Sequence, residues 1–327
     1  MSDYRHETTR DDLAAHARYA AHGPLHVAVT GASGLVGSTL VPMLTSGGHQ
    51  VTRLVRRPAR EGEVTWDPHA GFATAALDGV QAVVHLAGEN IAAGRWTASV
   101  KQRILNSRVE GTSVLCEGLA KMPVRPRALV CASAIGFYRD RGDEELTEAS
   151  TSGSGFLAEV ARAWEAATQP ARDAGIRVVN LRFGVILSPR GGALAKMLLP
   201  FKLGVGGRVG SGRQYWSWIS IDDAAGAVYH ALATEALSGP VNAVAPNPAT
   251  NAEFTRTLGR VLRRPTFFPA PAFALRLALG QMADELLLAS TRVVPEQLQK
   301  TDYHFRQPTL EAALRHVLGK PCRTAAS

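Results

Sequence analysis

Apolar runs and helical periodicities alternate along most of this chain. Continuous apolar runs at 25–29, 82–88 and 128–134 predict buried strands. After the first of these, apolar residues recur at helical spacing over 35–44, and alternation over 49–55 predicts a further strand. Strands that alternate with helices are typical of a parallel sheet that carries helices on both faces.

The second half of the chain continues this alternation and then becomes helical. A strand is expected at 176–181 and another at 241–245, in addition to a brief strand at 64–67. Between these late strands, a glycine-rich and apolar region at 191–212 is expected to wall a pocket and to move. Helical spacing and proline breaks predict four C-terminal helices, at 253–262, 272–279, 295–299 and 310–318.

These elements predict an α/β fold: a doubly wound parallel sheet, or Rossmann domain, with a small C-terminal cap that binds substrate. We expect the Rossmann domain at 25–184, completed by about 219–245, and the cap at 185–218 and 246–327. Residues 1–24 form a charged and then alanine-rich N-terminal extension, in which a short helix is possible before a Gly-Pro pair.

The number and spacing of the cysteines indicate the kind of cellular compartment in which the protein folds. Cys116, Cys131 and Cys322 are scattered among 327 residues without a Cys-x-x-Cys pair. Such a sparse, odd set argues for a reducing compartment and against a disulfide framework or a zinc site. We therefore expect a cytoplasmic protein without a metal.

The net charge of +8 does not by itself indicate nucleic acid. The basic residues are spread along the chain and form no tract interleaved with aromatic residues, so no nucleic-acid partner is expected. The chain also has no run of 18 apolar residues, and we expect no membrane contact. The apolar segment at 272–279 is interpreted as cap core or as a dimer surface.

A glycine-rich turn connects the first strand to the first helix. Gly31, Gly34 and Gly37 stand three residues apart, which suits a tight turn, a backbone approach to a pyrophosphate and close packing of helix on strand. An ordinary strand-to-helix turn is the alternative. The residues expected to bind a dinucleotide here are Gly31, Ala32, Ser33, Gly34, Leu35 and Val36.

The end of the second strand predicts which dinucleotide binds. A site for NAD places a carboxylate there to bind the ribose 2′-hydroxyl, whereas this chain has Arg56 and Arg57. Guanidinium groups can hold a 2′-phosphate, and no carboxylate opposes it. We therefore expect NADP(H), the alternative being two solvated arginines in a loop.

The glycine spacing after Thr30 resembles that of the short-chain dehydrogenase/reductase superfamily, in particular its extended, sugar-nucleotide-epimerase-like branch. The combination A-G-E-x-I, R-W and S-R-V-x-G-T at 87–112 resembles an atypical family of that superfamily which carries the name epimerase. The resemblance runs from about residue 25 to about 318. It implies that Leu86, Ala87, Gly88 and Glu89 pass beside the cofactor.

The resemblance also implies a Tyr-x-x-x-Lys pair on the helix after the fifth strand, and this chain lacks it. The tyrosine position holds Phe156 or Leu157, and the lysine position holds Val160 or Ala161. In the superfamily the tyrosine transfers a proton and the lysine lowers its pKa. The proton donor is therefore not identified by the resemblance.

Two residues near the fifth strand remain as catalytic candidates. The resemblance places a Ser or Thr at the strand end, where it polarises the substrate oxygen, and Ser133 stands there, although a different register would place Ala134. Tyr138 is the tyrosine of the exit loop; a structural or substrate-facing role is the alternative to acid catalysis. His85, inside an apolar run, is expected to be a buried structural residue.

Candidate substrate-binding residues lie at Lys101, Arg213 and Trp216. Arg213 stands where extended-family enzymes often hold a substrate phosphate or carboxylate, while Trp216 could equally belong to the core.

The sequence is compatible with two functions. The first is an oxidoreductase or epimerase that uses NADP(H) on a small polar substrate; the second is a non-catalytic protein that responds to NADP(H). A homodimer through the helices near 99–120 and 155–168 is expected from the resemblance.

Overall fold

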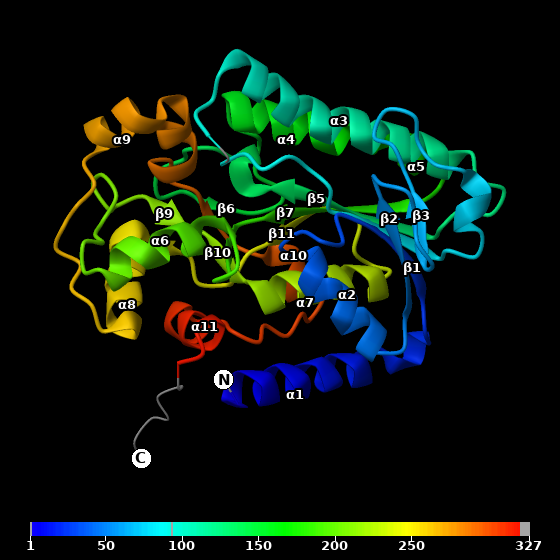
Figure 1. Cartoon of the computed structure of the whole chain (residues 1–327), viewed down its shortest axis with the longest axis horizontal. Helices are drawn as coiled ribbons and strands as arrows, with labels where there is room; N and C mark the ends of the chain where they lie inside the picture. The colour runs from blue at the N-terminus through cyan, green and yellow to red at the C-terminus, as the bar shows by residue number, and fades with distance from the viewer. Residues whose placement is uncertain (1, 93, 321–327) are drawn as a thin grey trace.

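A seven-stranded parallel sheet forms the centre of the computed structural model, which describes residues 2–92 and 94–320. The strand order is β11-β7-β5-β4-β1-β2-β3 (Figure 1). The strands are β1 (His26–Thr30), β2 (Gln50–Val55), β3 (Glu63–Thr65), β4 (Ala82–His85), β5 (Ala128–Ala134), β7 (Arg177–Phe183) and β11 (Gly239–Ala243). The order reverses between β1 and β4, and in such sheets ligands bind beyond the carboxyl ends of the strands at that point.

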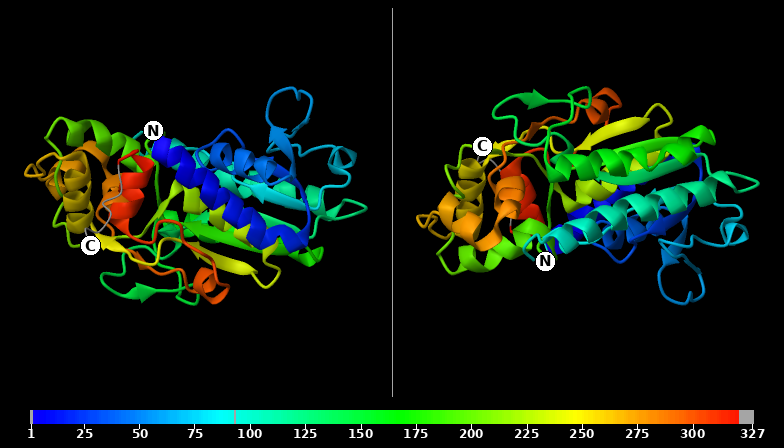
Figure 2. Two further views of the ribbon diagram at one scale, coloured as in Figure 1. Left: turned by 90° about the horizontal axis from the view of Figure 1, so that it is seen from below. Right: turned by 90° about the horizontal axis from the view of Figure 1, so that it is seen from above.

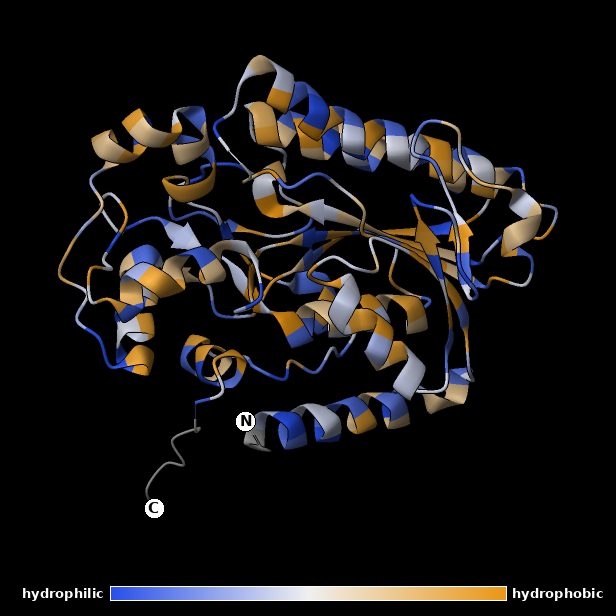
Figure 3. Ribbon diagram, viewed as in Figure 1, coloured by the Kyte–Doolittle hydropathy of each residue, from blue (hydrophilic) through white to orange (hydrophobic). Residues whose placement is uncertain are grey.

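Helices cover both faces of the sheet, as the predicted doubly wound fold requires. One face carries α3 (Ala98–Ala120), α4 (Phe156–Ala166) and α5 (Gln169–Asp173); the other carries α2 (Gly37–Ser46) and α7 (Ile221–Ala233) (Figure 1). The central strands are buried, because helices exclude water from both sides. Figure 3 shows these strands as an apolar layer between the helices. The predicted fold class is confirmed.

The cap lies beyond the carboxyl ends of the strands and is built from short elements. Three two-stranded pairs, β8 with β10, β9 with β12 and β6 with β13, tie its loops together. The remaining elements are β6 (Glu145–Leu146), β8 (Val185–Leu187), α6 (Gly192–Lys202), β9 (Tyr215–Trp216), β10 (Trp218–Ser220), β12 (Ala249–Thr250), α8 (Asn251–Leu262), α9 (Ala272–Leu279), β13 (Arg292–Val293), α10 (Glu296–Lys300) and α11 (Leu310–Val317). Short 3-10 turns occur at Ala20–His22, Thr74–Leu77 and Ile135–Phe137, and a π-helical turn, η4, at Ala283–Leu287.

The N-terminal extension is part of the folded body. It forms α1 (Ser2–Tyr19), a longer helix than the short one expected, and lies along the outside of the layer that contains α7 (Figure 2). The Tyr19 hydroxyl bonds to His230 Nδ1 at 2.7 Å, and Arg306 pairs with Asp12 at 2.8 Å. These contacts join α1 to α7 and to the segment that leads into α11.

Among the described residues, none of the helices is long and apolar enough to cross a membrane. Cys116 and Cys131 are buried and unpaired by disulfides, and Cys322 lies outside the described residues.

Candidate functional site

The glycine-rich turn between β1 and α2 has the geometry of a phosphate cradle. Gly31 has a φ of 67°, and a Cβ atom there would lie 2.8 Å from the Leu86 carbonyl carbon; a Cβ at Gly37 would collide with the Gly31 carbonyl oxygen. Ser33 and Gly34 between them are exposed. The turn therefore leaves its backbone open at the start of a helix, where N–H groups and the helix dipole favour an anion. This geometry fits a dinucleotide pyrophosphate.

A buried hydrogen-bond network holds the loop after β4 against the end of β1. The Thr30 hydroxyl bonds to His85 Nδ1 at 2.7 Å and accepts from the Leu86 and Ala87 amides at 3.2 and 3.3 Å. His85 Nε2 lies 3.0 Å from the Thr112 hydroxyl. Burial lowers the pKa of His85 to about 4, so the ring stays neutral. His85 is thus a structural residue, as expected, and Thr30 is a positioning residue that sequence reasoning missed.

The two arginines after β2 occupy different environments. Arg57 makes a bidentate pair with Glu63, with both N···O distances at 2.7 Å, and donates to the Pro58 carbonyl. The Arg57 guanidinium holds the pKa of Glu63 at about 2. Arg56 is exposed beside it. Of the two arginines, only Arg56 therefore presents its guanidinium to solvent without a carboxylate partner among the described residues.

The two catalytic candidates from the sequence belong to one buried polar network. Ser133 donates to Glu165 Oε1 at 2.8 Å, and Glu165 forms a bidentate pair with Arg182. Arg182 Nη1 donates to the Tyr138 hydroxyl at 2.8 Å, and that hydroxyl donates to Asn242 Oδ1 at 2.7 Å. The network links β5, α4, β7 and β11 across the sheet.

The environment of Tyr138 favours a structural role over acid catalysis. Its side chain is completely buried, and its hydroxyl is engaged by Arg182 and Asn242. Burial raises the pKa of Tyr138, and the neighbouring arginine only partly opposes that effect. A general acid must come within hydrogen-bond reach of the substrate. Ser133 is also buried, at 3% exposure, and both hydroxyls are hydrogen-bonded within the network.

The start of α4, where the superfamily pair would stand, is apolar. Phe156 and Leu157 pack in a cluster with buried Val160 and Met282. The Phe156 and Leu157 amides donate to the two carboxylate oxygens of Glu285, at 3.3 and 2.9 Å. Glu285 thus supplies the acceptor that the N-terminus of α4 lacks locally, since its N-cap, Gly155, has no side chain.

The exit loop of β5 also depends on Glu285. Arg139 has a φ of 61°, a left-handed conformation that favours glycine. Its guanidinium donates to the Ser154 carbonyl at 3.0 Å and lies 3.5 Å from the Glu285 carboxylate. These contacts anchor the long side chain in a turn that a smaller residue would fit with less strain.

Three candidate substrate residues are placed differently from one another. Lys101 Nζ donates to Gln281 at 3.0 Å and lies 5.2 Å from the centre of the Phe156 ring, so it stands beside the apolar start of α4. Arg213 is exposed on the cap. Trp216 is buried, donates to the Leu287 carbonyl and packs on Phe254; it belongs to the cap core.

Arg108 is a further residue of the site that sequence reasoning did not single out. Its guanidinium donates to the Glu89 carbonyl at 3.0 Å and stacks over the Trp164 ring at 4.9 Å. A Cβ at Gly88 would lie 3.5 Å from it. Desolvation lowers the pKa of Arg108 to about 10, and the group remains charged at neutral pH. The S-R-V-x-G-T motif could have identified Arg108, because it places an arginine on α3 next to the loop after β4.

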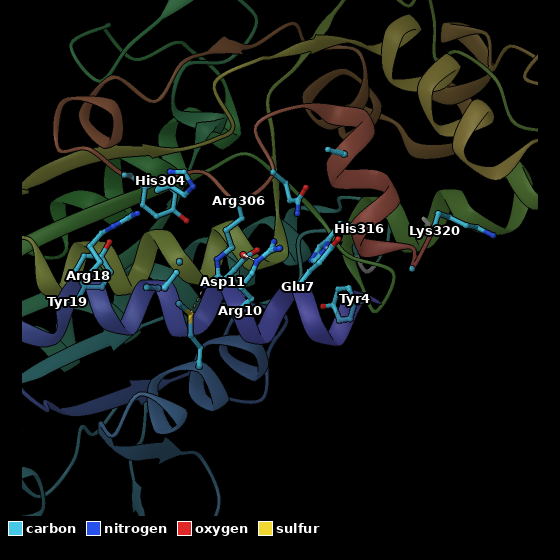
Figure 4. Close-up of a pocket in the computed structure, with 18 residues that line it drawn as sticks. Tyr4, Glu7, Arg10, Asp11, Arg18, Tyr19, His304, Arg306, His316 and Lys320 are labelled. Carbon is cyan, nitrogen blue, oxygen red and sulfur yellow. Dashed lines mark hydrogen bonds and ion pairs between the residues drawn. The ribbon is translucent and has the colours of Figure 1, made fainter. Parts of the chain in front are cut away.

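A separate pocket lies on the face of the sheet that carries α2 and α7. It has a volume of about 770 Å³ and lies between α1, α7 and α11 (Figure 4). Charged residues of both signs line it, among them Glu7, Arg10 and Arg306. None of the predicted cofactor or catalytic residues lines this pocket, so it is distinct from the cradle.

Fold and cradle together define a dinucleotide-binding protein of the Rossmann class. The chain belongs to the NAD dependent epimerase/dehydratase family, whose model matches residues 27–243; a second model, a domain of unknown function (DUF1731), matches residues 270–317. The resemblance inferred from the sequence is therefore confirmed. The second match contains α9 and η4, and so includes the residue that caps α4.

Relatives and solved structures of similar sequence carry the same family name. The epimerase family protein MT2273 of Mycobacterium tuberculosis is 45% identical over 297 residues, which cover 90% of this chain and 98% of that protein. The human epimerase family protein SDR39U1, crystallised with NADPH, superposes with a TM-score of 0.85 at 38% identity over 90% of this chain and 99% of that chain. A nucleoside-diphosphate sugar epimerase from Corynebacterium glutamicum gives a TM-score of 0.81 at 42% identity, over 97% of this chain and 63% of that longer chain.

Proposed function

We propose that this chain is an NADP(H)-binding oxidoreductase or epimerase that acts on a small polar substrate without the Tyr-x-x-x-Lys pair. The observation that carries the proposal is the open cradle, in which Ser33 and Gly34 are exposed in the turn before α2 while Gly31 and Gly37 are packed too closely to accept a side chain. A bound nicotinamide would supply hydride chemistry. The human relative crystallised with NADPH supports this choice of cofactor.

Arg56 is the residue that we assign to the 2′-phosphate. It is exposed at the carboxyl end of β2, next to the position where an NAD-specific site carries a carboxylate. The Glu63 carboxylate already occupies the guanidinium of Arg57. Arg57 therefore shapes the loop, and Arg56 supplies the charge that distinguishes NADP(H) from NAD(H).

Lys101 is the group that we assign to the substrate oxygen. Its ammonium lies beside Phe156, one of the two residues that replace the superfamily tyrosine, and it can donate a hydrogen bond where that tyrosine would have acted. Ser133 and Tyr138 keep Glu165 and Arg182 in place behind this region and are positioning residues.

Nucleotide titration tests the cofactor assignment. NADPH should bind about tenfold more tightly than NADH, a difference of roughly 1.4 kcal/mol, because Arg56 adds a charge-assisted hydrogen bond to the 2′-phosphate. Arg56→Ala should abolish the preference by weakening NADPH alone, while Arg57→Ala, as the matched control, should change it less. Nucleotide fluorescence measures both affinities. Equal affinities of the unmutated protein for the two nucleotides would overturn the assignment.

Turnover tests catalysis separately. With a panel of small hydroxy-ketones and hydroxy-aldehydes, we expect either net consumption of NADPH, followed by its ultraviolet absorbance, or a change in substrate configuration without net consumption, because an epimerase returns the hydride to its substrate. Lys101→Met should lower the measured rate by about 10² or more, as the loss of a general acid does, and should leave NADPH affinity unchanged. Lys121→Met, an exposed lysine just past the end of the same helix, is the control.

The competing function is a non-catalytic protein that binds NADP(H). The apolar cluster at the start of α4, in place of the proton-transfer pair, is the observation that favours it. Tight NADPH binding with no turnover of the panel, together with a Lys101→Met variant that behaves like the unmutated protein, would decide for this alternative.

A further inference from the structure

The outer end of the cap carries most of the large apolar side chains that the described chain exposes. Seven of the nine lie on α6, on the loop after it, on α9 and on the segment before α9: Leu199, Leu203, Val205, Phe267, Phe268, Phe273 and Leu277. Their exposed fractions run from 53% to 83%. We call these seven residues the cap patch. Monomeric proteins rarely expose so many large apolar residues together, and such patches mark interaction sites.

The members of the cap patch are neighbours in space. Gly204 lies against Pro265, and Val209 forms a β-bridge with Ala270, which places the loop after α6 along the segment that carries Phe267 and Phe268. Phe273 and Leu277 then follow one turn apart on α9. Figure 1 shows α9 and these loops together at one end of the molecule, and Figure 3 shows α9 as mainly hydrophobic.

Helix α9 is attached to the cap without being buried in it. None of its eight residues is buried, although the helix is strongly apolar. It is too short to cross a bilayer, for which about 20 residues are needed. An apolar surface helix with this exposure can instead insert its side chains into the interfacial region of a membrane.

The segments that form the cap patch carry charges of one sign. Residues 196–213 and 254–283 contain nine lysines and arginines and no aspartate or glutamate. Carboxylates outside these segments neutralise two of the nine, Arg260 and Arg276. Exposed phenylalanine and leucine with a basic rim match an anionic lipid surface, to which each basic residue adds attraction. The other seven are exposed and form no ion pair with a described residue: Lys196, Lys202, Arg208, Arg213, Arg256, Arg263 and Arg264.

From this combination we propose that the cap patch docks on the surface of a membrane that contains anionic lipid. The aromatic and leucine side chains enter the headgroup boundary, and the basic rim contacts lipid phosphates. A second copy of this chain fits less well, because a two-fold contact would bring the same basic rim against itself. The proposal does not rest on the proposed enzymatic function, and it reverses the sequence-based expectation of no membrane contact.

Vesicle flotation of the full chain tests the proposal. We expect binding to phosphatidylcholine vesicles that contain phosphatidylglycerol, weak binding to phosphatidylcholine alone, and weaker binding as salt is raised. The double variant Phe267→Ser/Phe273→Ser should reduce partitioning about tenfold or more, since each buried phenylalanine contributes substantially. Arg263→Glu/Arg264→Glu should remove the preference for anionic vesicles.

Matched controls separate docking from general effects. Val124→Ser removes an equally exposed apolar residue outside the cap patch, and Lys121→Glu reverses a charge close to Val124 in the sequence. Both variants should bind vesicles as the unmutated chain does. Circular dichroism and the melting temperature check that each variant is folded. No binding to anionic vesicles, or equal binding to both vesicle types, overturns the proposal. The proposal is also overturned if the Phe267→Ser/Phe273→Ser variant sediments with half the mass of the unmutated protein, because a second copy would then cover the cap patch.

Discussion

At the scale of single residues, the site replaces a proton-transfer pair by an apolar start of α4 and a buried ion pair behind it. Val160, one candidate for the superfamily lysine position, packs against Met282. Behind α4, Arg182 and Glu165 pair bidentately at 2.7 and 2.8 Å. A buried ion pair is stable only when its remaining donors and acceptors are satisfied. Ser133 and Tyr138 satisfy them, which is a structural reason for these residue types at these positions.

Tyr138→Phe distinguishes support from catalysis. We expect the free energy of unfolding to fall by about 1–3 kcal/mol, because Arg182 Nη1 and Asn242 Oδ1 each lose a buried hydrogen-bond partner. NADPH affinity and turnover should stay within about threefold of the unmutated values, since removal of a general acid costs about 10² to 10⁴. Urea unfolding and steady-state rates measure these effects. Tyr215→Phe is the control, and a hundredfold loss of turnover in Tyr138→Phe alone would restore this residue as the acid.

At the scale of elements, local pattern predicted the helices and strands well, and contacts between them poorly. The fifth strand at 128–134 and the helix at 272–279 were predicted with the bounds that the structure has. The extension was predicted as a short helix, yet α1 spans Ser2–Tyr19, because tertiary contacts stabilise a polar sequence with weak periodicity. Nothing near Phe156 signalled that Glu285, 129 positions away, would cap α4.

Removal of the Glu285 carboxylate should weaken α4. Glu285→Ala should lower the free energy of unfolding by about 1–2 kcal/mol, the usual cost of removing a helix cap, and it also leaves Arg139 without its ion-pair partner. Glu285→Gln keeps one acceptor and should destabilise the protein less. Urea denaturation measures both variants. Equal stability of Glu285→Ala and the unmutated protein would show that water replaces the carboxylate.

Helix α1 is anchored in part by a histidine, which makes the anchor dependent on pH. His316 lies between Asp222 at 2.8 Å and Glu7 of α1 at 3.1 Å (Figure 4). Desolvation lowers the pKa of His316, but the two carboxylates outweigh it and the pKa is raised above 6.5. A raised pKa stabilises the fold fully below the unfolded-state value and loses this effect as pH rises through the folded-state value.

The His316→Gln variant isolates this effect. Its stability deficit relative to the unmutated protein should be largest near pH 6 and should shrink towards about pH 9, as the histidine of the unmutated protein loses its proton. The histidines that burial keeps neutral, His85 and His230, are present in both proteins and cancel in the comparison. Urea midpoints across the pH range measure the deficit, and His304→Gln, at an exposed position, is the control. A deficit that does not change with pH would show that His316 acts through packing alone.

At the scale of the whole molecule, the cofactor half of the site could be predicted and the substrate half could not. Consecutive residues from Gly31 to Gly37 form the cradle, and its geometry follows from local backbone constraints. The substrate half that we propose would be assembled from distant segments: Lys101 donates to Gln281, and Lys196 of α6 donates to the Ala92 carbonyl. Such contacts depend on how the cap packs on the sheet, which single-sequence periodicity does not encode.

The oligomeric state is a further property of the whole molecule for which the family resemblance gives an expectation. The expected homodimer would pair α3 and α4 of two copies around a two-fold axis. These helices already pack on each other on one face of the sheet, and polar residues such as Arg103, Glu110 and Arg162 are exposed on them. An exposed face of this composition favours an interface with a polar rim rather than an extended apolar contact.

Light scattering at micromolar concentration should therefore report twice the mass of one chain. Glu110→Arg, which changes a charge in the middle of α3 without touching the core, should shift the protein towards the monomer, because the changed residue would face its own copy or a neighbouring arginine across the axis. Phe267→Ser on the cap patch should leave the mass unchanged and so separates this interface from membrane docking. A monomer for the unmutated chain at every concentration would contradict the predicted dimer, whereas a dimer that only Phe267→Ser disrupts would move the interface to the cap.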